Sequence, residues 1–515
     1  TPRQQMFTQR LYLYMNMTKP NQQLILSYSR VSCEGKSIRP SYLIEMIKKL
    51  YPDLIIEKPQ LQNEFEKVAT YKDGLELFGD KIRTFCETGE ISEELADLYT
   101  ALLSLPETRE QVEKLTEYAF FRYTTNPITS YIARQLYGKE LKNSVSRLET
   151  FARCAYAHFL QYGMKLKERE GFEFEAVDLG NIFHNVLEIF SNTLEENETD
   201  WLHFTKEQAD KWIEQAVEEQ SVLYKDSVLY SSARNRYAIL RMIRVLKKTV
   251  LSLQRQLQKG MFTPKRFEMG FRKNLLSSKE NPDLNMSIQG RIDRIDTYET
   301  DEKVYVKVMD YKSGNKKFDV VSFYYGLQLQ LVVYMNEAMK RAEKLHPGKE
   351  AVSAAMLYYH VDDPVVEGTV KMSPEEVNSK VREALRMKGV INSDGDVLEA
   401  LDTTKSAKSD CVTLDYDSKG GLKSTTNAYD SAQMKLLSDY ASYSLKAIGA
   451  RIKKGEIPVN PYASGNVDSC EYCAYKEVCG FDEKIPGYTK RNLSKDKDID
   501  YLELMKDTME EQQTK

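Results

Sequence analysis

Charged side chains end a run of alternating valines at residues 304–312, VYVKVMDYK. Side chains in a β-strand alternate between two faces, so the three valines share one face with Asp310 and Lys312. An apolar face of this kind predicts a strand that packs against a core. Charged groups are costly at the end of such a face unless they pair or bind an ion. The run therefore predicts a buried strand that ends in a functional site.

The preceding segment, GRIDRID at residues 290–296, predicts a partner for this strand. A hairpin that turns at Asp301 and Glu302 places Asp293 opposite Asp310, with Cβ atoms about 4.5–5.5 Å apart. Two carboxylates this close do not both stay ionised without a cation, and oxygen ligands favour Mg²⁺ or Mn²⁺. The alternative is an ordinary buried ion pair. The same register pairs three further residues with the valines: Ile295 with Val308, Thr297 with Val306, and Glu299 with Val304.

Four other side chains are candidates for the same site. Lys312 could hold the attacking water or a phosphate and stabilise charge that develops on phosphorus. His184 lies at the margin of an apolar helical stripe, where a histidine is more often structural, but the two aspartates need a third metal ligand. Gln330 and Tyr334 form an i, i+4 pair on a mainly apolar helix. They are either a hydrogen-bonded core pair or a pair that contacts DNA or orders the lysine.

Three of the seven cysteines lie in one short segment, CEYCAYKEVC. Cys470, Cys473 and Cys479 give three soft ligands, and a tetrahedral site needs a fourth. No second CxxC or histidine pair follows, so the spacing leaves zinc and a [4Fe–4S] cluster equally open. The best fourth ligand is Cys154, on a helix far upstream, which would close a very long loop. The other cysteines lack a comparable setting: Cys33, Cys86 and Cys411.

Length, composition and cysteine use narrow the class of protein. A chain of 515 residues is expected to form several domains, at roughly 150 residues each. Its 41% hydrophobic and 29% charged residues are typical of a soluble protein, and no apolar run approaches the ~20 residues of a membrane helix. The cysteines fit a reducing cytoplasm better than a secreted disulfide framework. The first residues, TPRQQMFTQR, lack an initiator methionine and a signal core, so we interpret the chain as a fragment.

One segment is strongly basic although the net charge of the chain is −4. The overall charge argues weakly against a nucleic-acid partner. Residues 231–260, however, carry eight Lys or Arg and no Asp or Glu, on a pattern of apolar residues at helical spacing. This amphipathic helix presents either a solvated face balanced by acidic neighbours or a face that contacts phosphates.

The pattern of apolar residues and breakers divides the chain into three parts. Residues 1–140 indicate a mostly helical region with one short strand at 24–30. Residues 141–485 form a second unit. Within it, residues 362–455 are polar and predict a loop or a small insertion. Residues 486–515 are a charged tail, expected to be a mobile helix or a strand-free extension.

The second unit is expected to open with helices and continue with strands. Ser146 and Glu149 predict a capping box for a helix that ends at Gly163, and Asp178 is a plausible N-cap of the helix that carries His184. We then expect three strands, at 265–271, 286–296 and 303–313, followed by a helix at 320–339 and a fourth strand at 353–361.

Taken together, these segments resemble a known family. The set SRLETFARCAYAHFLQYG, GNIFHNVLE, GRIDRID, DYKSG, GLQLQLVVY and CEYCAYKEVCGF is similar, in order over residues 140–485, to the AddB subunits of bacterial AddAB helicase-nucleases. These belong to the RecB-like branch of the PD-(D/E)XK nucleases. The resemblance implies an α/β restriction-endonuclease-like core, with a mixed central sheet flanked by helices. This core would follow, in the chain, a mostly helical N-terminal region that is the C-terminal part of a helicase-like region.

The resemblance also implies site residues and cofactors. His184, Asp293, Asp310 and the backbone carbonyl of Tyr311 would bind Mg²⁺ or Mn²⁺, and Lys312 would be the catalytic lysine. Gln330 and Tyr334 match the Q-x3-Y motif of the family. The resemblance favours the [4Fe–4S] cluster over zinc, with four ligands: Cys154, Cys470, Cys473 and Cys479.

The resemblance further implies a function and partners. The chain would be a cytoplasmic Mg-dependent exonuclease that cuts single-stranded DNA, on the 5′-terminated strand, as a complex with the AddA helicase-nuclease subunit unwinds a broken end. This activity would serve double-strand break repair by homologous recombination. The alternative is a nuclease fold that has lost activity and serves as a DNA-binding scaffold; the intact set of His184, Asp293, Asp310 and Lys312 argues against it.

Overall fold

The structure is a computed structural model that forms two compact units, Thr1–Phe121 and Arg122–Lys515. It describes residues 2–32, 36–56, 65, 68–169, 176–223, 230, 232–276, 285–369, 372–403, 408–423, 425–465, 467–493 and 499–513. The boundary between the two units lies between residues 121 and 122, before the domain boundary predicted near residue 140. The reason is backbone pairing inside the second unit, where Tyr123 N–H donates to Pro486 O and Ile128 N–H donates to Gly455 O.

The first unit is helical, as predicted. Phe78, Leu98 and Val112 form the centre of a small core. The strand expected at 24–30 is absent from this described segment, whose nearest ladder contact is a single bridge between Val31 and Ser37. The helices of the unit are α1 (Pro2–Met17), α2 (Tyr42–Leu50), α3 (Tyr71–Thr88), α4 (Glu93–Ser104) and α5 (Pro106–Ala119).

The second unit is built around a mixed seven-stranded sheet with the order β1-β3-β4-β5-β6-β7, in which β2 also pairs with β3. β3 and β4 are antiparallel, whereas β4 and β5 are parallel. The strands are β1 (Leu141–Asn143), β2 (Thr263–Leu276), β3 (Met286–Glu299), β4 (Lys303–Lys312), β5 (Glu350–His360), β6 (Lys388–Asn392) and β7 (Ala428–Tyr429). The predicted α/β class with a mixed central sheet is confirmed.

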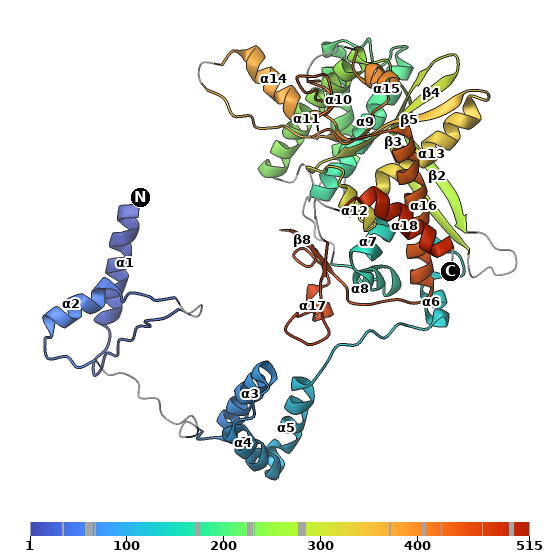
Figure 1. The fold of residues 1–515 in the computed structure, drawn as a ribbon. Helices are drawn as coiled ribbons and strands as arrows, with labels where there is room; N and C mark the ends of the chain where they lie inside the picture. Colours follow the sequence, from blue (N-terminus) through green and yellow to red (C-terminus); the bar gives the residue numbers. More distant parts are fainter. Residues whose placement is uncertain are drawn as a thin grey trace. The chain divides into compact units, whose positions relative to one another are not determined.

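Helices cover both faces of the sheet (Figure 1). Val304, Val306 and Val308 of β4 pack into one core, whereas Tyr305 and Met309 pack into the other. The first core includes α7 (Val145–Arg153), α13 (Gln330–Leu345), α16 (Ser431–Lys453) and α18 (Tyr501–Gln513). The second includes α9 (Ala176–Glu196), α10 (Lys206–Leu223) and α11 (Ala233–Lys259). The period-two pattern therefore separates two apolar layers.

The predicted hairpin register is confirmed. Thr297 pairs with Val306, and Ile295 pairs with Val308. The ladder runs on through Arg294 and Met309, so the next opposed residues are Asp293 and Asp310. The two carboxylates therefore share one end of the β3–β4 hairpin.

The helix predicted from Ser146 to Gly163 is interrupted at Cys154. Cys154 is extended (φ −162°, ψ 118°), and α7 ends before it. α8 (Ala155–His158) and a π-helical turn (Phe159–Gly163) follow. The predicted capping box is wrong, because the N-cap is Ser144, whose hydroxyl accepts the N–H of Arg147. Glu149 is thus available for a different contact. Asp178 is not a cap either, since α9 begins at Ala176.

The helix predicted at 320–339 is also interrupted. α12 (Val320–Tyr324) stops before Gly326, whose φ is +77°, and α13 begins at Gln330. An added Cβ at Gly326 would lie 3.3 Å from Cβ of Ala152 and 3.2 Å from Ile448. A left-handed backbone at this close contact favours glycine and ends the first helix. The break places Gln330 at a helix N-terminus.

The polar stretch 362–455, expected to be a loop or small insertion, instead belongs to the main fold. A segment rich in Ser, Thr and Lys at residues 403–427 dominates its composition and so hides this role. The stretch supplies β6 and β7 to the sheet and three helices: α14 (Pro374–Ala384), α15 (Gly395–Leu401) and α16. The charged tail is also anchored, because Tyr501 and Met505 of α18 are buried in the core. The remaining elements are α6 (Ser130–Tyr137), β8 (Tyr462–Ser464), β9 (Val467–Asp468), α17 (Lys476–Cys479) and β10 (Arg491–Asn492).

Candidate active site

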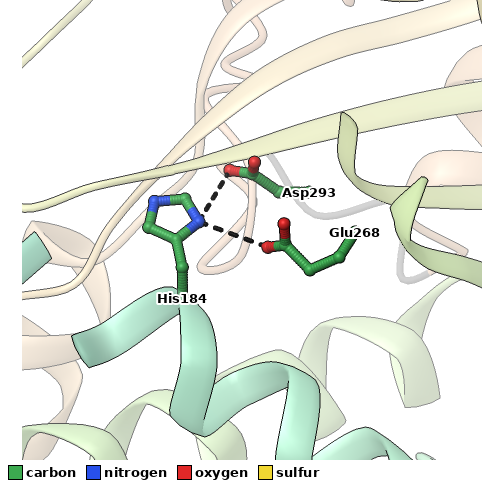
Figure 2. Close-up of side chains that lie close together, drawn as sticks. All are labelled: His184, Glu268 and Asp293. Atoms are coloured by element: carbon green, nitrogen blue, oxygen red, sulfur yellow. Dashed lines mark hydrogen bonds and ion pairs between the residues drawn. The ribbon is translucent and has the colours of Figure 1, made fainter. Parts of the chain in front are cut away.

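His184 reaches the end of the hairpin from α9. Its Nδ1 lies 3.4 Å from Oδ2 of Asp293 and 3.4 Å from Oε1 of Glu268 (Figure 2). Its Nε2 lies 3.1 Å from the carbonyl oxygen of Tyr311. Burial lowers the pKa of His184, but the hydrogen bond to Glu268 and the charge of Asp293 outweigh it and raise the pKa overall. A cation, whether the protonated ring or a metal ion, is therefore favoured here.

Asp293 is held close to Asp310 in a buried position. The exposed fraction is 6% for Asp293 and 1% for Asp310. Burial and then the charge of Asp310 raise the pKa of Asp293 to about 8. The N–H of Tyr311 donates a 2.7 Å hydrogen bond to Oδ2 of Asp293 and so fixes the carboxylate to β4. Two buried carboxylates that repel each other are a suitable site for a divalent cation.

Lys312 and Gln330 contact the second carboxylate from two directions. Lys312 Nζ lies 2.6 Å from Oδ2 of Asp310, and Gln330 Nε2 donates to Oδ1 at 3.1 Å. The Gln330 amide also donates to the hydroxyl of Tyr334 at 3.1 Å. Gln330 and Tyr334 therefore form a hydrogen-bonded pair, one of the two alternatives for their spacing, and Gln330 also contacts Asp310. The lysine side chain is one-quarter exposed, so it can meet a ligand from solution.

Glu268 is a site residue that the sequence analysis missed. β2 and β3 pair through Phe267 with Arg294 and through Met269 with Ile292, so Glu268 falls opposite Asp293. Its φ is +46°, a strained value for a residue other than glycine. One sequence signal could have indicated Glu268: it is an acidic residue among the apolar residues of FEMGF, in the strand that precedes GRIDRID.

The donor set suits a hard divalent cation. The ligand atoms of His184, Glu268 and Asp293 all lie within 4.8 Å of one another. Carboxylate and backbone carbonyl oxygens suit Mg²⁺ and Mn²⁺, whereas the imidazole nitrogen is a ligand more typical of transition metals. The site stands where the two layers meet, because α9 brings His184 from one face and α13 brings Gln330 from the other.

The structure brings the four predicted cysteine ligands together. Cys154, Cys470, Cys473 and Cys479 line one cavity of about 570 Å³. Burial, Asp468 and the neighbouring thiols raise the pKa of Cys470 to about 11. Thiols that oppose one another's ionisation in this way are suited to a shared cationic group, either a metal ion or a cluster. Cys86 lies on α3 of the first unit, and Cys411 lies in the segment between α15 and β7. Cys33 is outside the described residues.

The basic helix is largely neutralised by acidic neighbours. Arg244 and Lys248 of α11 both pair with Asp363, at 2.6 Å each. Arg255 and Lys259 both pair with Asp410. Lys247 and Arg241 have acidic partners too. These pairs favour the balanced-face interpretation over a phosphate-contacting helix. Among the described residues, no helix combines the length and apolar character needed to cross a bilayer.

Comparison with known proteins agrees with this geometry. A family model described as the PD-(D/E)XK nuclease superfamily matches residues 142–480 and supports the restriction-endonuclease-like core. The chain is similar to a protein of Lachnoclostridium phytofermentans that is named as a subunit of an ATP-dependent helicase/deoxyribonuclease, 35% identical over 96% of this chain and 42% of that protein. For the protein of the same name in Bacillus subtilis the identity is 30%, over 98% of this chain and 44% of the relative. The chain thus spans less than half the length of these relatives.

Proposed function

The chain belongs to the PD-(D/E)XK nuclease superfamily, and on this basis we propose that it is an active metal-dependent deoxyribonuclease. The observation that carries the proposal is the convergence of His184, Asp293, Asp310 and Lys312 at the end of one hairpin. A structural ion pair needs one acid and one base. Here the Lys312–Asp310 pair lies beside two further acids, Asp293 and Glu268, which share the imidazole of His184. Burial together with the charge of Asp310 raises the pKa of Asp293. That arrangement destabilises the fold unless it binds a cation.

We assign the metal-ligand role to His184, Asp293, Asp310 and the carbonyl of Tyr311. A bound Mg²⁺ or Mn²⁺ would supply a Lewis acid that makes water nucleophilic at neutral pH and offsets charge on phosphorus. Lys312 would hold the water or the scissile phosphate, since its ammonium group projects from the same strand end as Asp310. Gln330 would keep the Asp310 carboxylate oriented through its 3.1 Å hydrogen bond.

The substrate and partner proposals rest on the names of the relatives. Those proteins are named as helicase/deoxyribonuclease subunits, so we propose that this chain acts on single-stranded DNA released by a partner helicase-nuclease of the AddA type. Cutting of the 5′-terminated strand and a role in recombinational break repair belong to the same proposal. The neutralised basic helix supports a shared DNA channel, because the chain offers little free positive charge of its own on that helix.

We also propose a [4Fe–4S] cluster held by Cys154, Cys470, Cys473 and Cys479. Two observations support it: the four thiols line one cavity, and the cysteine spacing resembles that of the AddB subunits. The cluster would be structural, since it would join α7 near the start of the unit to the segment around α17 near its end.

The nuclease proposal is tested by Mg²⁺-dependent cleavage of end-labelled single-stranded DNA. Asp310→Ala should abolish cleavage, and Asp301→Ala, at the exposed hairpin turn, should leave it unchanged. Labels placed separately on the 5′ and 3′ ends report the direction of cutting. Equal rates for wild type and Asp310→Ala, or no cleavage by either, would favour the scaffold alternative.

A further inference from the structure

Helix α13 begins without a capping side chain of its own. Its N-cap residue is Leu329, which has no side-chain hydrogen bond to offer, and its first residue is Gln330. The first N–H groups of a helix have no acceptor within the helix, so they need one from elsewhere. The start of this helix matters for the site because Gln330 contacts Asp310.

Glu149 supplies the missing acceptor from a distant part of the chain. Its Oε1 accepts the N–H of Leu329 at 2.7 Å and the N–H of Gln330 at 3.1 Å. A carboxylate at a helix N-terminus is also stabilised by the helix dipole. Glu149 thus binds the backbone of the residue whose side chain donates to the candidate metal ligand.

The helix that carries Glu149 is itself fixed at its end. Arg491 donates to the carbonyl groups of Ala152 and Arg153, at 2.6 and 2.9 Å. The next residue is Cys154, which lines the cysteine cavity. Gly326, at the corner before α13, packs closely against Ala152 of the same helix. Helix α7 therefore contacts both the start of α13 and the corner that precedes it, and α7 ends at the cysteine cavity.

We propose that Glu149 is a positioning residue that sets the N-terminus of α13 and thereby holds Gln330 against Asp310. Through α7, it connects the cysteine cavity with the active site. The inference rests on the proposed nuclease function for its effect on rate, and on the contacts above for its effect on the helix. The contacts of Glu149 described above are with the backbone of Leu329 and Gln330, so it acts on the candidate metal ligands through Gln330.

The first test is amide hydrogen exchange on the full chain, which does not depend on activity. Glu149→Ala should increase deuterium uptake in the first turn of α13, while Glu149→Gln, which keeps a carbonyl acceptor, should retain most of the protection. The matched control is Glu140→Ala, because Glu140 also accepts two hydrogen bonds, from Ser287 and Arg272, but does not contact α13. Wild-type uptake at α13 in Glu149→Ala would overturn the proposal.

The second test separates positioning from a general structural effect. Glu149→Ala and Gln330→Ala should each weaken Mn²⁺ binding, measured by calorimetry, and slow DNA cleavage by about 10- to 100-fold, as the loss of a residue that orients a metal ligand typically does. The double variant should lose little more than either single variant, because both changes remove the same contact with Asp310. If the fold-losses of the two single variants multiply in the double variant, Glu149 does not act through Gln330. If the wild type does not cut DNA, the nuclease proposal fails, whereas uptake and Mn²⁺ affinity still decide the role of Glu149.

Discussion

The backbone N–H of Tyr311 donates a 2.7 Å hydrogen bond to Oδ2 of Asp293. The carbonyl of the same residue lies 3.1 Å from Nε2 of His184. One peptide segment of β4 therefore orders an acid from β3 and an imidazole from α9. Because the contacts come from the backbone, the candidate metal site depends on the strand register, which the buried Tyr311 side chain helps to hold by packing into the core.

Lys312 should be needed for catalysis and dispensable for ion binding. Replacement by methionine keeps most of its volume and removes the ammonium group, so single-stranded DNA cleavage should fall by about 100-fold or more. Mn²⁺ binding, measured by calorimetry, should remain or strengthen, since Lys312 competes with the ion for Asp310 at 2.6 Å. Loss of Mn²⁺ binding together with activity would instead assign the lysine to the metal site. Lys317→Met, at an exposed position shortly beyond β4, is the matched control.

Divalent-ion affinity should rise with pH. The pKa of Asp293 is raised to about 8, so below that pH an ion must displace a proton to bind. For one displaced proton the apparent affinity for Mn²⁺ changes by about tenfold per pH unit below pH 8. Titrations at about pH 6, 7 and 8 check this. An affinity that is flat over this range would contradict it, and Asp293→Asn should show a weaker dependence.

The same shift should make the metal-free protein less stable as pH rises. The unfolded chain releases the Asp293 proton near its ordinary pKa of 3.8, whereas the folded protein retains it to about 8. Between these values the folded state binds more protons, so this contribution to the free energy of unfolding falls with increasing pH. Urea unfolding in chelator, compared between wild type and Asp293→Asn, should show a steeper fall for wild type.

Cys154→Ser should remove the cluster although the other three thiols remain in place. A [4Fe–4S] cluster needs four thiolates, so iron should fall from about four per chain to near zero, with loss of visible absorbance. Cys86→Ser changes an exposed thiol of the first unit and should retain the iron. One zinc and no iron in the wild-type protein would show that the four cysteines form a zinc site.

Asp296 should be essential for stability. It forms a bidentate pair with Arg294, and its Oδ2 lies 2.9 Å from Nζ of Lys307; all three residues are fully buried. Asp296→Ala would leave two buried cations without their anion and should cost about 3–5 kcal/mol of unfolding free energy. Asp301→Ala, at the exposed turn, should stay within about 0.5 kcal/mol. Denaturant unfolding measures both, and a cost near zero for Asp296→Ala would mean that the buried pair relaxes.

The strands around the site could be predicted because their pattern is local. The alternation of Val304, Val306 and Val308 places Asp310 on a known face, and the turn at Asp301 sets the register. The breaks at Cys154 and Gly326 could not be read from helical periodicity, since apolar residues continue across both. The polar stretch 362–455 adds β6 and β7 to the sheet. Its composition did not predict this, because the Ser-, Thr- and Lys-rich segment at residues 403–427 is typical of a loop.

The amino-acid sequence by itself determined the hairpin, its opposed acids and the C-x2-C-x5-C segment, because side-chain alternation and short spacings act between near neighbours in the chain. Only the tertiary structure decided that Glu268 joins His184, that Glu149 caps α13, and that Cys154 reaches the cysteine cavity. Those contacts join segments far apart in the chain. They arise from how the layers pack on the sheet, a relationship that no local pattern records.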